Sequence, residues 1–386
     1  DKSLMRNVLA YDIGRSLESY APRTQFCEVI LNNDYVGIYL FMEKIKKDDN
    51  RVDIDDTEPD NLSGGYLLEL NPLTKIDSTD NYFESESQGR FFVIKFPDKD
   101  NITVDQITWI KDYINIFEST LYTDLFNDPD IGYYQYIDSP SWVDYILLNE
   151  AFRNNDVFYA STYLYKKKNS KLFAGPIWDF NIAMGNIDYN DNWLTEGLLL
   201  DSKYLSSILL KDSSFVSASQ LRWNTLRNNQ LSMNMINTLI DDYAILLETA
   251  QERNFERWPI LGSNIWPNYY IGQTYEDEVN YLKQWITDRF IWMDEHVGLA
   301  FSGCSDSIAC NYDVTATMDD GNCNYAEENY HCDGNCINDT DEDGICDEDE
   351  LSLLNGLIPE NFSIYSIYPN PFNPVTNIIY GLPEHV

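Results

Sequence analysis

A sharp change in composition near residue 303 constrains the fold more than any other feature of this sequence. The residues before it are rich in Trp, Tyr, Leu and Ile and contain all 26 Lys and Arg residues. Segment 304–350 has no Lys or Arg, 15 Asp and Glu, and six of the seven Cys. Such a segment cannot form an ordinary apolar core, so something other than burial must order it. We therefore predict a globular domain at 1–302, a Cys-rich acidic spacer at 303–350, and a truncated module at 351–386.

The charge balance limits the partners of the chain. With 26 bases against 64 acids the net charge is −38, so nucleic acid would be repelled over most of the surface. No apolar run approaches the ~18 residues that a membrane-spanning helix needs, and we expect no transmembrane segment. The chain opens without a secretory signal pattern, and we expect the first domain to begin upstream of Asp1.

The periodicity of the first 302 residues predicts an α+β fold. Apolar alternation indicates strands at 26–31, 35–42, 66–70 and 90–96, the first two forming a hairpin. Three- to four-residue spacing indicates helices at 9–20, 104–126, 141–152, 203–211, 215–228, 233–255 and 275–296. Because most strands precede most helices, the two kinds of element should segregate rather than alternate.

A further predicted hairpin provides the clearest functional signal. Strand-like runs at 162–167 and 172–178 flank a turn centred on Asn169. Antiparallel pairing about that centre places residue 161 opposite residue 177, so Asp156 and Asp179 should be neighbours at the open end. Two carboxylates from separate segments suit phosphoryl transfer, because one can position a hydroxyl while the other holds a divalent cation. The alternative is that each Asp only caps a turn.

Five blocks of sequence, in order, resemble the CotH kinase family of spore-coat-type atypical protein kinases. They are DKSLMRNVLA at 1–10, VGIYLFME at 36–43, GGYLLE at 64–69, ND at 155–156 with STYLY at 161–165, and GPIWDFN at 175–181 with GN at 185–186. The resemblance extends to about residue 298 and includes WPILG at 258–262 and WPN at 266–268. It implies an atypical kinase-like fold, with β-hairpins and a helical C-terminal half, that uses ATP and a divalent metal.

The resemblance also assigns roles to particular residues. Asp156 would be the catalytic Asp, and Asp179 would be the metal-binding Asp that holds Mg²⁺ or Mn²⁺. Many family members have Asp where this chain has Asn181, which is a weaker oxygen ligand. Ser161 stands where other members have Asn, so the second metal contact differs here.

The base that grips the phosphates is normally expected upstream of Asp1 in this family. Lys95, Lys44 and Arg6 could replace it, and the alternative for each is a solvated surface charge. Glu43 and Glu69 lie in apolar strand-like runs, where an unpaired carboxylate is costly to bury, so each needs a cationic or amide partner. We expect Glu43, Glu69 and Lys95, together with Ser161, to form the ATP-contacting set.

The spacer contains a calcium-loop pattern. Asp339, Asp341, Asp343 and Glu350 match D-x-[DN]-x-[DN]-G-x5-E, with Gly344 at the sharp turn. The flanks are not helical, so the segment resembles a thrombospondin type-3-like repeat more than an EF-hand. Bound Ca²⁺ would neutralise the carboxylates and order a segment that cannot form an ordinary apolar core. The alternative is a solvated acidic linker.

We expect the spacer to resist proteolysis in millimolar Ca²⁺ and to be cleaved in chelator, provided that its disulfides are intact. Removal of the cation leaves Asp341 and Asp343 as like charges within one short loop, which should open. The protection should appear at ~10⁻⁴–10⁻³ M Ca²⁺, the range of extracellular calcium modules. Identical digestion patterns with and without Ca²⁺ would reduce the match to an acidic linker.

The cysteines and the end of the chain indicate the compartment. Six Cys without paired C-x-x-C spacing favour disulfides in an oxidising compartment over zinc, with fifteen connectivities open, and Cys27 is expected to be free. The sequence YPNPFNPVTNIIYGLPE at 368–384 resembles the start of the C-terminal sorting domain of type IX secretion cargo, a small β-sandwich. That resemblance implies attachment to the outer membrane, whereas a plain Pro-rich linker is the alternative.

Together these features predict a secreted or cell-surface kinase that transfers the ATP γ-phosphate to a Ser or Thr hydroxyl of a surface protein. The alternative is an inactive CotH-like adhesin that binds proteins or glycans through exposed Tyr and Trp. A calcium-dependent scaffold is a third interpretation.

Overall fold

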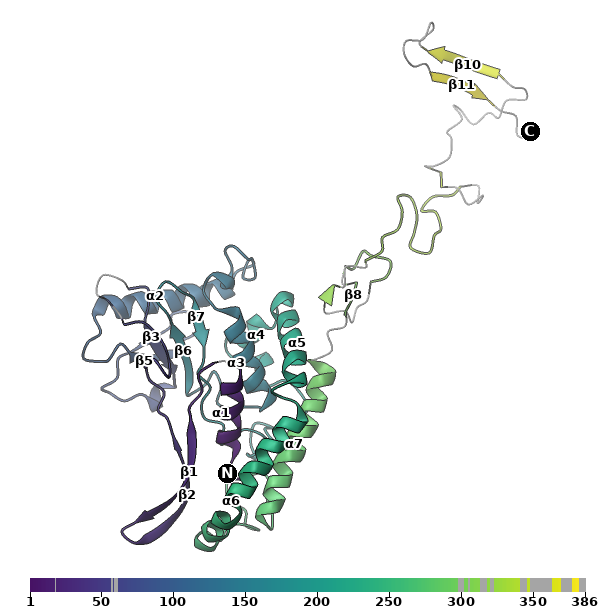
Figure 1. Cartoon of the computed structure of the whole chain (residues 1–386). Coiled ribbons are helices and arrows are strands. Elements are labelled where there is room, and N and C mark those ends of the chain that lie inside the picture. Colours follow the sequence, from purple (N-terminus) through teal and green to yellow (C-terminus); the bar gives the residue numbers. More distant parts are fainter. Residues whose placement is uncertain are drawn as a thin grey trace. The chain divides into compact units, whose positions relative to one another are not determined.

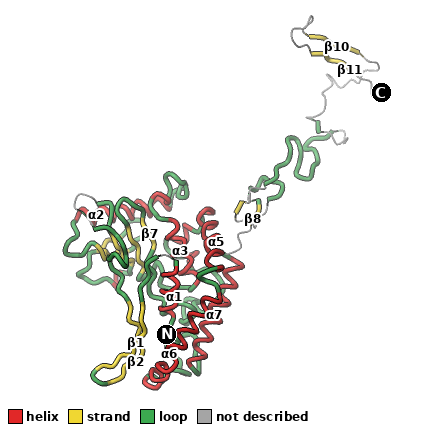
Figure 2. The backbone as a smooth tube through the Cα atoms, in the orientation of Figure 1, coloured by secondary structure: helices red, strands yellow, loops and turns green. Residues whose placement is uncertain are grey.

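A computed structural model divides the chain into two compact units, Asp1–Phe301 and Ser302–Val386. It describes residues 1–17, 19–56, 58, 62–297, 302–304, 306–312, 318–319, 323–340, 346–347, 363–368 and 377–381. Figure 1 colours these residues along the chain, and Figure 2 colours them by secondary structure. The predicted three-part division into domain, spacer and sorting module stays a prediction.

The first unit contains a five-stranded antiparallel sheet with the strand order β4-β5-β3-β6-β7. Its strands are β3 (Tyr66–Leu70), β4 (Tyr82–Glu84), β5 (Phe91–Phe96), β6 (Thr162–Lys166) and β7 (Leu172–Ala174). One face of the sheet joins the main core, where Tyr66 stacks on Trp109 of helix α2 (Val104–Leu121). Leu67 and Tyr163 on the opposite face form a smaller cluster with the apolar side chains of segment 45–54.

The hairpin that was predicted around Asn169 is present. β6 and β7 pair antiparallel, with Leu164 opposite Ala174. Continued by three residues in each direction, this register places residue 161 opposite residue 177, as the sequence predicts. The loops before β6 and after β7 therefore meet at the same end of the sheet.

Strands β1 (Thr24–Leu31) and β2 (Asp34–Met42) form a separate two-stranded hairpin, also as predicted. In Figure 1 this hairpin reaches away from the five-stranded sheet. It packs on helix α6 (Met233–Arg257), where the Asn254 side chain accepts a hydrogen bond from the Ile38 amide at 2.9 Å. The Trp258 indole donates to the Val36 carbonyl at 2.7 Å. These bonds satisfy polar backbone groups of β2 that the sheet leaves open.

The remaining helices form the other half of the unit and make the fold α+β, as predicted (Figure 2). They are α1 (Arg6–Ser16), α3 (Ser139–Ala151), α4 (Ser206–Leu209), α5 (Ser213–Asn228) and α7 (Tyr275–His296), with short 3₁₀ turns η1 (Leu73–Lys75), η2 (Tyr133–Gln135) and η3 (Leu200–Ser202). Arg289 of α7 forms an ion pair of 2.5 Å with Glu150 of α3, and both side chains are buried. Loss of either partner would leave an unpaired buried charge, so this pair fixes how the two helices pack.

Two predicted helices are shorter than expected. The helix at 104–126 ends at Leu121, and only Ser206–Leu209 of 203–211 forms a helix. Leu205 adopts a left-handed backbone with φ 63°, which interrupts the helical path directly after Lys203 and Tyr204. Among the described residues, no helix is long and apolar enough to cross a membrane.

Three disulfides are described in the second unit. They join Cys304 to Cys323, Cys310 to Cys332 and Cys336 to Cys346, and Cys27 in the first unit is free. The prediction that these six cysteines form disulfides rather than a zinc site is therefore confirmed. The three pairs are one of the fifteen pairings that the sequence left open. The unit also holds the strand pairs β8 (Ser302–Gly303) with β9 (Met318–Asp319) and β10 (Ser363–Tyr368) with β11 (Asn377–Gly381).

The calcium-loop prediction falls largely outside the described part of the chain. Asp339 is described, whereas Asp341, Asp343 and Glu350 lie outside the described residues. Calcium binding and the resemblances to a thrombospondin-like repeat and a sorting domain stay predictions.

Candidate functional site

Asp156 and Asp179 lie on two loops that the structure joins directly. Asp156 is in the loop between α3 and β6, and Asp179 follows β7. The side-chain nitrogen of Asn154 donates a hydrogen bond of 3.3 Å to the Trp178 carbonyl. The side-chain oxygen of Asn154 accepts a hydrogen bond of 3.3 Å from the backbone amide of Asp156. One side chain thus joins the two loops, and the prediction that the loops carrying Asp156 and Asp179 are neighbours is confirmed.

Helix α1 holds the backbone on the other side of Asp179. The Asp179 amide donates to the Tyr11 hydroxyl at 3.1 Å, and the Phe180 amide donates to the Asn7 side chain at 2.8 Å. Asn7 and Tyr11 are four residues apart and therefore share one helix face. Asp179 itself has φ 65°, a left-handed conformation that such contacts must stabilise.

The two carboxylates repel each other. Burial and then the negative charge of Asp156 raise the pKa of Asp179, and Glu69 adds to this effect. Lys75 and a hydrogen bond from the Ser161 hydroxyl act in the opposite direction. Asp179 is therefore a partly buried carboxylate whose charged form lacks full compensation, which is a common state of functional carboxylates.

Ser161 is fixed beside Asp179 by its own backbone. Its amide donates to the Asn71 side chain at 2.9 Å, and it too has a left-handed φ of 51°. Two residues of one small region thus adopt an uncommon backbone conformation. Backbone strain of this kind, ~1–3 kcal/mol per residue, concentrates at functional sites.

Glu69 and Lys95 extend the site along the sheet. Their side chains form an ion pair of 3.3 Å between β3 and β5, and both are largely shielded from water. The Tyr163 hydroxyl also bonds to Glu69, and burial followed by the charges of Glu69 and Asp179 raises the pKa of Tyr163. Lys95 therefore meets the predicted need of Glu69 for a cationic or amide partner, and Glu69 is close enough to Asp179 for its charge to raise the pKa of Asp179.

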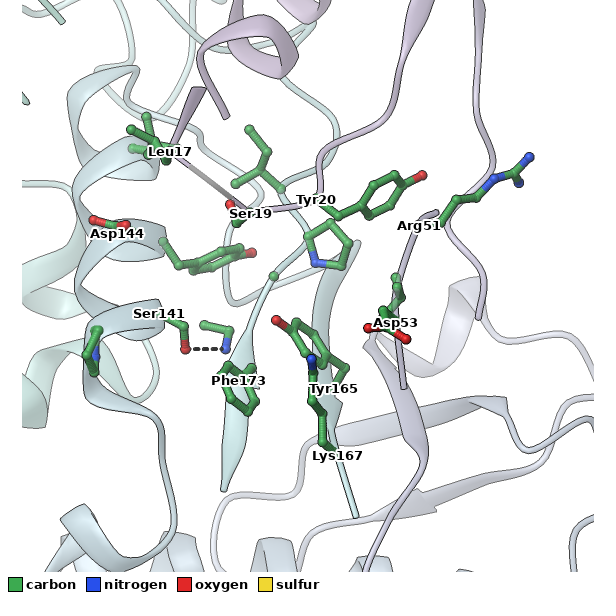
Figure 3. Close-up of a pocket in the computed structure, with 18 residues that line it drawn as sticks. Leu17, Ser19, Tyr20, Arg51, Asp53, Ser141, Asp144, Tyr165, Lys167 and Phe173 are labelled. Carbon is green, nitrogen blue, oxygen red and sulfur yellow. Dashed lines mark hydrogen bonds between the residues drawn. The ribbon is translucent and has the colours of Figure 1, made fainter. Parts of the chain in front are cut away.

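Glu43 lies in a different group of charges. It forms an ion pair with Arg23 and another of 3.4 Å with Arg51, so its predicted need for a cationic partner is met. Arg51 lines the cleft shown in Figure 3, together with Tyr20, Tyr165 and Phe173. Asp156 and Asp179 do not line this cleft.

The other predicted residues fall in varied places. Asn181 is exposed, and its carbonyl accepts a hydrogen bond of 2.7 Å from Asn186. Lys44 is exposed. For Arg6, the alternative of a solvated surface charge is wrong, because its side chain is buried and forms an ion pair of 2.6 Å with Asp1, while its role as a substitute phosphate-gripping base stays a prediction. An acidic partner allows that burial.

The donor set suits a divalent cation that is shared with a phosphate. Within the described residues no cluster of three or more His, Cys, Asp or Glu could hold a metal alone. Mg²⁺ is usually bound by one or two carboxylates, with waters and substrate phosphates completing its shell. The Asp179 oxygens with the Ser161 hydroxyl fit that pattern, because a cation there would relieve the repulsion between Asp179 and Asp156.

Several residues of the site were not identified from the sequence. Asn7 and Tyr11 on α1, Asn71 after β3, and Asn154 and Tyr163 beside the carboxylates all contact it. The four-residue spacing of Asn7 and Tyr11, which places both on one face of α1, was the available signal. Asn71, by contrast, had no local pattern, because its partner Ser161 is 90 residues away.

Comparison with known families gives one match for this chain. Residues 1–293 match the family model described as CotH kinase protein. The match contains both carboxylates and every other contact of the site described above. The comparison with curated proteins finds no match.

Proposed function

The chain belongs to the CotH kinase family, and from this we propose that it transfers the γ-phosphate of ATP to a Ser or Thr hydroxyl of a secreted or surface protein. Membership of a kinase family implies ATP as the phosphate donor. The nature of the acceptor, the metal and the location outside the cell are the parts that we add.

The observation that carries the proposal is the fixed pairing of Asp156 with Asp179. Their loops share the Asn154 hydrogen bonds, and their charges act on each other. Two neighbouring carboxylates in a protein usually require a bound cation or a proton that compensates their negative charges. Phosphoryl transfer uses both a proton and a cation, because one carboxylate accepts the proton of the acceptor hydroxyl and the other holds the metal.

In the proposed step the acceptor oxygen bonds to the γ-phosphorus while the bond from this phosphorus to the β,γ-bridging oxygen breaks. ADP is the leaving group, and Asp156 accepts the hydroxyl proton. Asp179, with Ser161 beside it, would hold Mg²⁺ or Mn²⁺, which supplies charge neutralisation on the phosphates when bound. Lys95, oriented by Glu69, would contact the phosphates.

Three disulfides support a location in an oxidising compartment. The paired cysteines are 19, 22 and 10 residues apart, in a segment whose composition does not favour an apolar core. We therefore place the kinase outside the cytoplasm.

The proposal is tested by thermal shift with ATP, with Mn²⁺, and with both together. We expect stabilisation by the pair well beyond either alone, since the metal would be held jointly by carboxylates and phosphates. Labelled ATP incubated with surface proteins should then label acceptors. Retention on glycans or proteins without any response to nucleotide and metal would favour the adhesin instead.

A further inference from the structure

A second cleft, of about 390 Å³, opens beside Asp156. Its wall includes Asn155 and Asp156 from the loop before β6, Lys203 from the turn before α4, and Arg90 directly before β5. Tyr159, which is 53% exposed, lies at its rim. The cleft is large enough for a few side chains of a bound peptide.

Two cations line this cleft beside Asp156. The Lys203 ammonium donates a hydrogen bond of 3.0 Å to the Asn155 carbonyl, which directs it toward the Asp156 loop. The Arg90 guanidinium lies over the Tyr204 ring, 5.0 Å from its centre. The charges of Asp156 and Arg90 both affect the pKa of Lys203, so the three groups are close in space.

Within the described part of the chain, Lys203 and Arg90 form no ion pair with a carboxylate. Among the residues that the structure describes, neither Arg90 nor Lys203 is within 4.0 Å of an Asp or Glu oxygen, although the chain has 64 acids for 26 bases. Burial is the largest influence on the pKa of Lys203 and lowers it, and the charge of Arg90 acts in the same direction, whereas the charge of Asp156 opposes both. An anionic ligand would supply the missing charge.

We propose that this cleft binds the acceptor and selects a Ser or Thr that is flanked by Asp or Glu. The inference rests on the proposed function and adds the class of substrate to it. The acceptor hydroxyl lies at Asp156, while the flanking carboxylates pair with Lys203 and Arg90. Tyr159 covers the acceptor backbone at the rim.

The test uses three peptides of equal length in which one Ser is flanked by Glu, by Gln or by Lys. We expect kcat/KM to be highest for the Glu peptide, roughly tenfold above the Gln peptide, which corresponds to about 1.4 kcal/mol. The reason is that opposite charges attract more strongly in a partly desolvated cleft than in water. Lys203→Glu should reverse the order and favour the Lys peptide. Arg90→Gln should reduce the preference for Glu and provides a second variant should Lys203→Glu not fold.

Lys211→Glu is the matched control, since it makes the same charge change at an exposed residue outside the cleft. It should keep the preference for the Glu peptide. Equal kcat/KM for the three peptides would overturn the inference. So would an equal loss for all three in Lys203→Glu, because Lys203 would then act on the transferred phosphate.

A binding experiment separates this inference from the proposed function. A fluorescent Glu peptide should bind without nucleotide, with fluorescence anisotropy as the readout, and Lys203→Glu should weaken that binding. Absence of any phosphoryl transfer, with this binding intact, would sink the kinase assignment but keep the acidic-peptide cleft. Phosphoryl transfer without selective binding or selective turnover would support the kinase assignment and contradict the acidic-peptide cleft.

Discussion

Asp156→Asn is expected to abolish measurable phosphoryl transfer while the protein stays folded and still binds metal and ATP. A positioned proton acceptor contributes about 10²–10⁴-fold to such a reaction, and the amide cannot accept the proton. The substitution keeps the shape of the side chain and leaves the backbone bond from residue 156 to Asn154 in place. Transfer of label from ATP to an acceptor measures the loss, and thermal shift with Mn²⁺ and ATP measures the retained binding.

Asp188→Asn is a suitable control for this variant. Asp188 is exposed, follows the Asp179 loop, and would lose the same single charge. Its activity should remain near that of the original protein. Retained turnover in Asp156→Asn would contradict the assignment of the catalytic Asp.

Asp179→Ala is expected to remove metal-dependent nucleotide binding. The substitution removes the main proposed metal ligand, whereas loss of a mere outer-shell partner already costs about 10–100-fold in metal affinity. We therefore expect at least about a 100-fold rise in the Kd for ATP with Mn²⁺, measured by titration calorimetry. ATP binding in the presence of chelator should change much less. An unchanged Kd with Mn²⁺ would place the metal elsewhere.

The same carboxylate should determine how metal binding depends on pH. The pKa of Asp179 is raised, so its charged form is lost at a higher pH than that of an ordinary Asp, which titrates near ~3.9. Mn²⁺ affinity should therefore fall, as the pH is lowered, while exposed carboxylates are still ionised. Asp156→Asn removes a charge that raises this pKa, so it should move the midpoint of Mn²⁺ binding to lower pH. A midpoint that does not move would show that the two groups are not coupled.

Local pattern was enough to predict the core of the site. The turn at Asn169 sets the register of β6 and β7, and that register alone brings Asp156 and Asp179 to one end of the sheet. Hairpin pairing depends on a few adjacent residues, so a single sequence contains the information. The need of Glu69 for a cation was predictable for a similar reason, since a carboxylate within an apolar strand cannot stay unpaired.

Long-range packing decided the rest of the site. The sequence did not indicate that Asn7 and Tyr11 would support the backbone at Asp179, because α1 is about 170 residues away along the chain. It did not place Arg90 and Lys203 in one cleft, since they come from opposite halves of the domain. The left-handed residue that shortens α4 also has no local signal, because Leu usually avoids that conformation.

The sequence by itself determined the α+β class, most strands of the first unit except β4, most helices, the closeness of Asp156 and Asp179, and the presence of disulfides. Each of these follows from spacing or composition within a short stretch of chain. The tertiary structure alone decided which cysteines pair, that Glu43 binds Arg23 and Arg51, and which cations lie beside Asp156. Those choices depend on how distant elements pack, because any of several partners satisfies the same local requirement, and only the folded chain brings one of them within reach.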